Sequence, residues 1–201
     1  MIYAVILAAG ISSRLGTPKQ LLSYQGRPLV AHVVDTICRT GVEKVFVVLG
    51  HRAEEVRETL KEYDVNFVHN PDYASGQSTS LRAGLNALGD SAGAALFVLG
   101  DQPLLKPRTV NRIIEEYRLG GKGIVAPFYR GKRGNPVLFN KKYFPEIFAL
   151  TGDTGARKII EFNKNQLARV DVDDAGVVFD IDTWEDYSKL IKFEQGVGFI
   201  E

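Results

Sequence analysis

A loop of small residues that carries two cations lies between residues 8 and 19. It reads A-A-G-I-S-S-R-L-G-T-P-K, and its cations are Arg14 and Lys19. Small residues let backbone N–H groups approach an anion closely, and the two side chains add positive charge. The spacing fits neither the G-x-G-x-x-G pattern of dinucleotide-binding folds nor the G-x-x-x-x-G-K-S/T pattern of P-loop proteins. We therefore interpret the segment as a phosphate-binding loop of another kind, with a plain structural turn as the alternative.

A second segment rich in hydroxyl groups spans residues 70–85 and reads N-P-D-Y-A-S-G-Q-S-T-S-L-R-A-G-L. Gly76 and the Ser-Thr-Ser run at 78–80 are typical of a turn followed by a helix N-cap. A helix N-terminus beside the first loop would also offer hydroxyl and N–H groups to a nucleotide base or ribose. On the residues alone, both interpretations stay open.

Carboxylates follow two further apolar runs. Asp101 comes directly after the run L-F-V-L-G, and Asp180 and Asp182 follow residues 177–179. Mg²⁺ typically takes one or two carboxylates together with phosphate oxygens and water. The pattern therefore predicts a Mg²⁺ site built from two distant segments. The alternatives are a loop role for Asp101 and a helix N-cap role for Asp182, and Asp180 competes with Asp182 for the metal.

The first loop closely resembles the L-A-A-G-x-S-x-R-x-G-x-x-K signature of the MobA-like nucleotidyltransferases, and among them it looks most like the molybdenum cofactor cytidylyltransferases. The resemblance runs through several separated motifs over nearly the whole chain. Residues 7–10 read L-A-A-G, whereas the guanylyltransferase branch typically reads L-A-G-G, so the resemblance favours CTP over GTP. Leu15 stands where methionine is common in the family, which is a volume-conserving difference.

The resemblance implies a role for each matching residue. The loop would wrap the triphosphate, with Arg14 and Lys19 as catalytic residues that neutralise its charge, and Asp101 and Asp182 would hold Mg²⁺. The turn R-G-K-R-G at 130–134 and the segment T-G-D-T-G-A-R at 151–157 match strings that surround the acceptor in the family, although such a turn is more commonly a solvated loop. The nucleotide contacts would be Leu7, Ala8, Ala9, Gly10, Gly16, Gly76, Ser78 and Ser80, and the acceptor contacts Asn135, Asp153 and Arg157.

The activity implied by the resemblance is transfer of CMP from CTP to the terminal phosphate of molybdopterin or molybdenum cofactor, with release of pyrophosphate. The partners would be CTP, a phosphorylated pterin acceptor and molybdoenzyme apoproteins. A phosphate nucleophile is already ionised at neutral pH, which fits a sequence without an obvious His–carboxylate or Ser–His pair. The rival hypotheses are a cytidylyltransferase acting on a sugar or polyol phosphate, a non-catalytic, chaperone-like nucleotide binder, and an NAD(P)-linked oxidoreductase that lacks the dinucleotide fingerprint.

The elements that must position these residues alternate between strands and helices. Apolar, β-branched runs at 3–7, 44–49, 65–69 and 94–99 predict buried strands, and helical spacing predicts helices at 27–40, 53–62, 78–88 and 107–118. This alternation indicates right-handed βαβ units with helices on both faces of a mainly parallel sheet. We expect one α/β domain over residues 1–201, a three-layer, Rossmann-like fold similar to that of the nucleotide-diphospho-sugar transferases.

A small β-rich accessory region is expected after Gly120. A strand at 124–129, a polar turn and a returning strand at 135–139 are followed by helices at 141–149 and 155–163. Short strands are predicted at 167–172 and 177–180, and a last helix at 183–192. Residues 195–201, with apolar Val197, Phe199 and Ile200, either pack back on the domain or meet a partner.

Composition limits the remaining possibilities. Of the 201 residues, 45% are hydrophobic and 24% charged, and the net charge of +1 argues against a dedicated nucleic-acid binder. The single cysteine, Cys38, excludes a disulfide framework and is expected in the core. His32, His51 and His69 lack metal-ligand spacing, so zinc is not expected. The run at 2–7 is too short for a membrane span and lacks the basic start of a signal peptide, which predicts a cytoplasmic protein with no membrane association.

Overall fold

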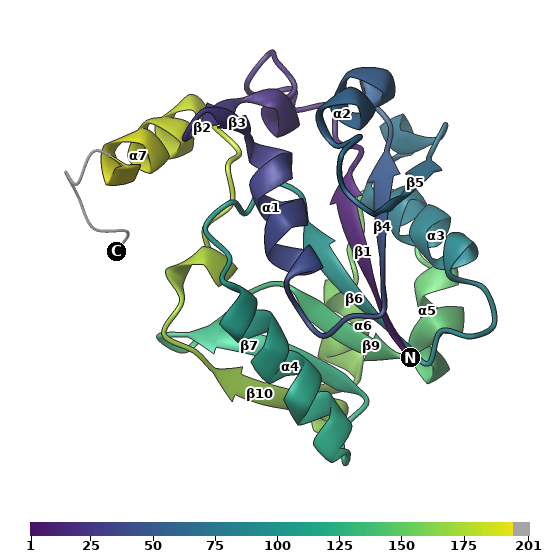
Figure 1. Ribbon diagram of the computed structural model, residues 1–201. Coiled ribbons are helices and arrows are strands. Elements are labelled where there is room, and N and C mark those ends of the chain that lie inside the picture. Colours follow the sequence, from purple (N-terminus) through teal and green to yellow (C-terminus); the bar gives the residue numbers. More distant parts are fainter. Residues whose placement is uncertain (195–201) are drawn as a thin grey trace.

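The computed structural model describes residues 1–194, and at its centre is a mixed eight-stranded sheet (Figure 1). The strands are β1 Ile2–Ala8, β4 Lys44–Leu49, β5 Asn66–His69, β6 Ala94–Leu99, β7 Ile124–Tyr129, β8 Lys132–Arg133, β9 Val137–Asn140 and β10 Leu167–Asp171. They are ordered β10-β7-β9-β6-β1-β4-β5, and β8 pairs with β7. The half from β6 to β5 is parallel, while β9 runs antiparallel to both β6 and β7.

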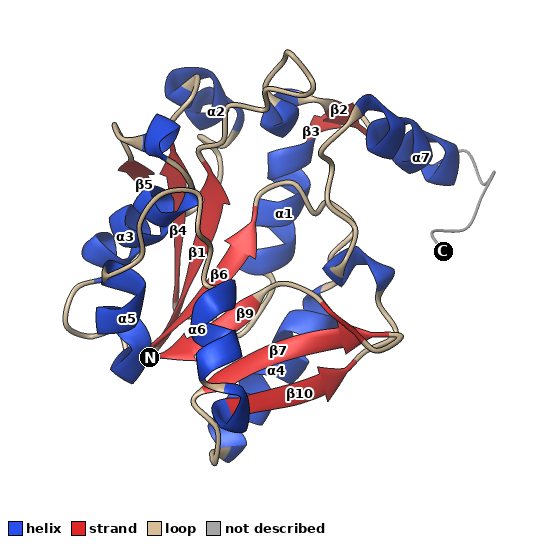
Figure 2. Ribbon diagram, turned by 180° about the vertical axis from the view of Figure 1, so that it is seen from behind, coloured by secondary structure: helices blue, strands red, loops and turns tan. Residues whose placement is uncertain are grey.

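Helices cover both faces of this sheet, as the alternating sequence pattern predicts (Figures 1 and 2). The central strand β1 shows why: Ala4 and Ile6 belong to one core, and Tyr3 and Val5 belong to the other. Successive side chains of a strand point to opposite faces, so a strand that is apolar throughout needs cover on both. One face packs against α1 Leu29–Cys38, α2 Ala53–Thr59 and α4 Pro107–Leu119, and the other against α3 Gln77–Leu88, α5 Phe144–Phe148 and α6 Arg157–Phe162.

A third, smaller core attaches the last helix, α7 Trp184–Glu194. Leu190 and Ile181 are fully buried there, and Leu15 from the first loop packs with them. The short strands β2 Ser23–Tyr24 and β3 Arg27–Pro28 pair beside them, and the Tyr187 hydroxyl donates to the Ser23 carbonyl at 2.6 Å. This core brings residues 179–182 next to the loop at 10–19. Two segments that are far apart in the sequence therefore meet at one edge of the sheet.

The structure confirms the three-layer α/β fold and corrects three details of the prediction. Residues 177–180 form no strand, because Val177 ends a 3₁₀ turn and packs in a different core from Phe179, so this short apolar run only imitates a strand. The first helix begins at Leu29 rather than residue 27, because Pro28 belongs to β3. Cys38 is exposed rather than buried, because it ends α1 at the flank of the buried face.

The β-rich region after Gly120 extends the main sheet rather than standing apart from it. The expected strand, turn and returning strand are β7, the short β8 and β9, and β10 adds a parallel edge beside β7. Among residues 1–194 no helix is long and apolar enough to cross a membrane. The expectation for residues 195–201 concerns a segment outside the described residues.

A buried carboxylate, Asp174, ties the C-terminal segment to the start of α4. It is 1% exposed and accepts from the Thr109 hydroxyl at 2.6 Å, from the Lys106 N–H at 3.1 Å and from the Gly176 N–H at 3.1 Å. Replacing Asp174 with alanine is expected to lower the free energy of unfolding by about 3 kcal/mol, because buried donors lose a charged acceptor. Guanidinium denaturation measures this loss. Asp173→Ala, at the exposed neighbouring position, is expected to change little, and equal losses in the two variants would contradict the assignment.

Candidate active site

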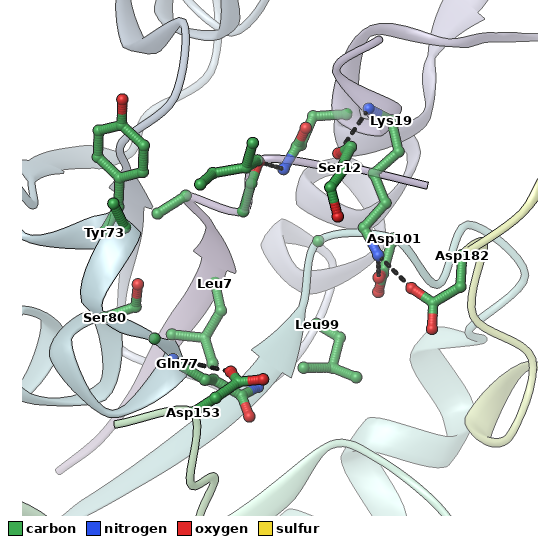
Figure 3. A pocket seen from close by; sticks show the side chains of 18 of the residues that line it. Leu7, Ser12, Lys19, Tyr73, Gln77, Ser80, Leu99, Asp101, Asp153 and Asp182 are labelled. Carbon is green, nitrogen blue, oxygen red and sulfur yellow. Dashed lines mark hydrogen bonds and ion pairs between the residues drawn. The ribbon is translucent and has the colours of Figure 1, made fainter. Parts of the chain in front are cut away.

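A pocket of about 740 Å³ opens at the carboxyl ends of β1 and β6, beside the start of α3 (Figure 3). Ligands of open parallel sheets bind at this edge. In the view of Figure 3, Lys19 and Asp182 lie opposite Tyr73 and Ser80. The lining residues come from the first loop and η1, the 3₁₀ turn Lys19–Leu21, from residues 73–80, from the end of β6, and from the segments around 153 and 180–182.

The Lys19 ammonium lies between two carboxylates. It makes an ion pair with Asp101 Oδ2 and another with Asp182 Oδ1 at 2.7 Å. The side chains of Lys19 and Asp101 are 15% and 13% exposed, so water screens their contact only weakly. Burial alone would lower the pKa of Lys19, but the carboxylates of Asp101 and Asp182 outweigh it and raise that pKa above its usual value. Lys19 therefore stays charged in the pocket.

The first loop is fastened by its own side chains. The Lys19 N–H donates to Ser12 Oγ at 3.0 Å, and the N–H groups of Leu15 and Gly16 donate to the Ser12 carbonyl. The buried amide of Gln20 donates to the Gly10 carbonyl at 3.2 Å. These bonds close the loop over the end of β1 and direct the Lys19 side chain to the carboxylates.

Three carboxylates converge on the same side of the pocket. Asp101 follows β6 and is 9% exposed, and its Oδ1 is buried with no hydrogen-bond partner among the described residues. Burial raises the pKa of Asp180, and the negative charges of Asp101 and Asp182 raise it further. No group of three or more His, Cys, Asp or Glu side chains within residues 1–194 is arranged to hold a metal ion by itself. The three carboxylates therefore offer more negative charge than the Lys19 ammonium alone can neutralise.

The start of α3 is capped by a distant segment. Asp153 Oδ1 accepts from the Gln77 N–H at 3.2 Å, and the Gly152 carbonyl accepts from the Ser78 N–H at 3.2 Å. The first N–H groups of a helix lack partners within it, so these two acceptors satisfy them. Asp153, which we expected to contact an acceptor, has this capping role in the structure and also lines the pocket.

The pocket unites residues from every group predicted by sequence. Those that line it are Leu7, Ala9, Gly10, Arg14, Lys19, Gly76, Ser80, Asp101, Asp153 and Asp182. The other predicted nucleotide contacts do not: Ala8 is buried at the end of β1, Gly16 is in an exposed turn, and Ser78 is fully buried behind the surface. Asn135 donates its N–H to the Val177 carbonyl, and exposed Arg157 pairs with Glu161 on α6. Neither Asn135 nor Arg157 lines the pocket.

Ser12, Gln20, Tyr73 and Gln77 are among the residues that line the pocket but were assigned no role from the sequence. Ser12 and Gln20 belong to the first loop or adjoin it, and Tyr73 and Gln77 flank Gly76. Because they lie near residues with an assigned role, they could have been identified as pocket residues from the sequence. The packing of the Tyr73 ring, whose centroid lies 6.1 Å from that of His51, was not predictable from spacing.

Gly76 lets the 152–153 segment reach α3. Its φ is +104°, and a Cβ there would lie 2.4 Å from the Gly152 carbonyl carbon. Gly76→Ala is therefore expected to displace this segment and to weaken binding of the nucleotide that the sequence leads us to expect here about tenfold or more, since the clash adds to a backbone strain of about 1–3 kcal/mol. Calorimetric titration with CTP, the nucleotide that the sequence resemblance favours, measures the loss. Gly89 also has a positive φ, +67°, but a Cβ there would meet nothing within 4 Å, so Gly89→Ala controls for strain. Equal CTP affinities in the two variants would rule out the contact as the cause.

Comparisons with known proteins identify similar sequences over most of the chain. A family model described as a MobA-like NTP transferase domain matches residues 4–170. The chain is 33% identical over 198 residues to the nicotine blue oxidoreductase of Paenarthrobacter nicotinovorans, covering 93% of this chain and 95% of that protein. It is 27% identical over 187 residues to the molybdenum cofactor cytidylyltransferase of Escherichia coli K12, covering 91% and 92% of the two chains.

A solved structure extends the similarity to three dimensions. Rv0371c from Mycobacterium tuberculosis H37Rv, described in complex with manganese, superposes with a TM-score of 0.82 at 30% identity. The superposition covers 95% of this chain and 98% of that one. The similarity therefore extends over nearly the whole fold.

Proposed function

The chain belongs to the MobA-like NTP transferase family, and on that premise we propose that it transfers CMP from CTP to the terminal phosphate of molybdopterin or molybdenum cofactor. One observation carries the proposal: Lys19, Asp101 and Asp182 come from three separate segments and meet inside one pocket at the carboxyl edge of the sheet. Fixed cations and clustered carboxylates at one rim are what a metal-bound polyphosphate requires.

The nucleotide is assigned to the space between the first loop and the start of α3. A volume of about 740 Å³ lies within the range of small-molecule sites. In this assignment the triphosphate lies against the loop with Arg14 and Lys19, and the base lies toward Gly76 and Ser80. CTP is preferred because residues 7–10 read L-A-A-G, and the cytidylyltransferase from Escherichia coli supports that choice.

The carboxylates suit a divalent cation that binds together with the nucleotide. Asp101 has a buried oxygen without a partner among the described residues, and the charges of neighbouring carboxylates add to burial in raising the pKa of Asp180. We assign Asp101 and Asp182 as the side chains that would hold Mg²⁺, an ion that proteins typically bind with one or two carboxylates. The bound ion would supply neutralisation of charge on the phosphates. The manganese complex of the mycobacterial relative is consistent with a divalent cation in this family.

The chain's own residues provide positioning and positive charge. An oxygen of the acceptor phosphate bonds to the α-phosphorus of CTP while the bond from that phosphorus to the pyrophosphate oxygen breaks. Lys19 and Arg14 meet the negative charge that develops on the leaving pyrophosphate, and N–H groups of the first loop hold the phosphates in line. The attacking phosphate is already ionised at neutral pH, so no side chain has to remove a proton.

The acceptor is assigned to the side of the pocket at Asp153. Asp153 caps α3 and lines the pocket. The segment 151–157 therefore lies beside the part of the pocket that would hold the base. Asn135 and Arg157 stay proposed acceptor contacts that would engage a molecule extending beyond the pocket. Molybdoenzyme apoproteins are the proposed recipients of the product.

A second candidate function is reduction of a substrate such as nicotine blue by NADH or NADPH, which is oxidised to NAD⁺ or NADP⁺. The similarity to nicotine blue oxidoreductase, 33% identity over most of both chains, favours it. Against it, the loop after β1 lacks the G-x-G-x-x-G pattern that places a dinucleotide pyrophosphate on a helix N-terminus.

Pyrophosphate release tests the proposal. Purified protein is incubated with Mg²⁺, each of the four nucleoside triphosphates, and molybdopterin, a sugar phosphate, a polyol phosphate or no acceptor. We expect release only with CTP and molybdopterin or its metal-loaded form. Release with a sugar or polyol phosphate would identify that compound as the acceptor in place of molybdopterin. CTP binding without release would indicate a nucleotide-binding partner, and oxidation of NADH or NADPH with nicotine blue, without release, would establish the oxidoreductase.

A further inference from the structure

The Lys19 ammonium lies between the two carboxylates that we propose as metal ligands. It contacts Asp101 Oδ2 and Asp182 Oδ1, the latter at 2.7 Å. Asp101 is largely buried and Asp182 is partly exposed, and two neighbouring carboxylates at such a site are stabilised by a cation between them. Here the protein itself supplies that cation. A lysine that holds both carboxylates is also an obstacle to any other cation.

We propose that Lys19 and a divalent cation compete for Asp101 and Asp182, so that the metal binds well only when the Lys19 ammonium moves to another anion. This inference rests on the proposed metal-dependent transfer and gives Lys19 a role in the order of binding. The anion that receives Lys19 is the polyphosphate of the nucleotide, because Lys19 and the phosphate-binding loop line the same pocket. Metal and nucleotide then bind cooperatively, and the protein without nucleotide binds metal weakly.

The geometry allows this exchange by a side-chain movement alone. The backbone of Lys19 is held by its N–H bond to Ser12 Oγ at 3.0 Å, while four flexible methylenes carry the ammonium. Arg14 is a weaker competitor, because its side chain is 72% exposed and it meets Asp182 Oδ2 only at 3.5 Å. The competition is therefore assigned to Lys19.

Binding of Mn²⁺ without nucleotide tests the proposal directly. Electron paramagnetic resonance of free Mn²⁺ gives the affinity of the wild-type protein and of three variants. Lys19→Met removes the charge at similar length and is expected to bind Mn²⁺ about tenfold or more tightly, because opposing charges a few Å apart interact strongly at a partly buried site. Lys19→Arg keeps the charge and is expected to bind as weakly as the wild type.

Lys61→Met is the matched control, because it changes the net charge equally. Lys61 is an exposed lysine that pairs with Glu58 on the surface and does not line the pocket. Its Mn²⁺ affinity is expected to equal that of the wild type. A Lys19→Met variant that binds Mn²⁺ no more tightly than the wild type, or no more tightly than Lys61→Met, would overturn the proposal.

A second measurement uses only the wild-type chain, so its result does not depend on whether a variant folds. An amine-specific reagent modifies exposed lysines, and mass spectrometry of the peptides gives the rate at Lys19 and at Lys61. Mn²⁺ is expected to accelerate modification of Lys19 severalfold by displacing it from its carboxylates, and CTP added with Mn²⁺ is expected to slow it again. The rate at Lys61 should not change. A Lys19 rate that does not respond to Mn²⁺ would contradict the competition.

The two proposals fail in different ways. If the protein releases pyrophosphate from CTP but shows neither Lys19 effect, the proposed transfer stands and the proposed competition is wrong. If the protein shows both Lys19 effects but releases no pyrophosphate with any triphosphate, the competition stands and the proposed transfer is wrong.

Discussion

Asp101→Asn is expected to lower the rate of nucleotidyl transfer by about a thousandfold, a loss of the size caused by removing one preorganised electrostatic group. Asparagine keeps the shape of the side chain but removes its negative charge. It therefore loses the proposed metal ligand and the ion pair that places Lys19. Pyrophosphate release under saturating CTP measures the effect, and Mn²⁺ titration of the same sample measures the loss of metal affinity.

Asp171→Asn is the matched control for this substitution. Asp171 is an exposed carboxylate at the end of β10 that pairs with Arg169 on the surface. Its loss is expected to leave transfer unchanged, and thermal unfolding shows whether either variant is destabilised. A folded Asp101→Asn protein with near-wild-type turnover would remove Asp101 from the catalytic site.

Lys19→Met has the second-largest expected effect, a fall in kcat/KM of about a hundredfold or more. The variant is expected to bind metal more tightly in the absence of nucleotide, yet to lack the cation that would meet the charge on the leaving pyrophosphate. We expect kcat to fall as well as CTP affinity, because this charge develops mainly in the transition state. Steady-state kinetics over a range of CTP concentrations separates the two contributions.

Lys19 and Asp101 act as one unit, so their effects should not add. The double variant Asp101→Asn with Lys19→Met is expected to be no slower than the slower single variant, as for other groups that function together. Losses that multiply would show that the two residues act independently. Lys19→Arg is expected to recover part of the activity, since it restores the charge without the same reach.

The central sheet was predictable because its strands are apolar on both faces. Residues 44–49 and 94–99 coincide with β4 and β6, since continuous β-branched and apolar runs have few other stable places in a small α/β protein. The segment at 177–180 shows the limit of this reasoning. Its apolar residues Val177 and Phe179 fill two different cores instead of one face of a sheet, and only the tertiary packing reveals this.

The site was predictable where it depends on strand ends. Asp101 and the first loop follow neighbouring parallel strands, so topology alone brings them to one edge. The contact of Asp182 with Lys19 depends instead on the small core around Leu15, Ile181 and Leu190, which has no periodic signal. The cap that Asp153 places on α3 was likewise hidden, because the two segments are 76 residues apart.

The fate of the phosphorus atoms of CTP distinguishes nucleotidyl transfer from every other use of the triphosphate. The protein is incubated with Mg²⁺, molybdopterin and CTP that carries the label either on the α-phosphorus or on the γ-phosphorus. We expect the α-label to appear on the pterin product and the γ-label to leave as pyrophosphate, and we expect both transfers to stop when Mg²⁺ is chelated. Appearance of the γ-label on the acceptor, or retention of both labels in intact CTP, would contradict nucleotidyl transfer in this pocket.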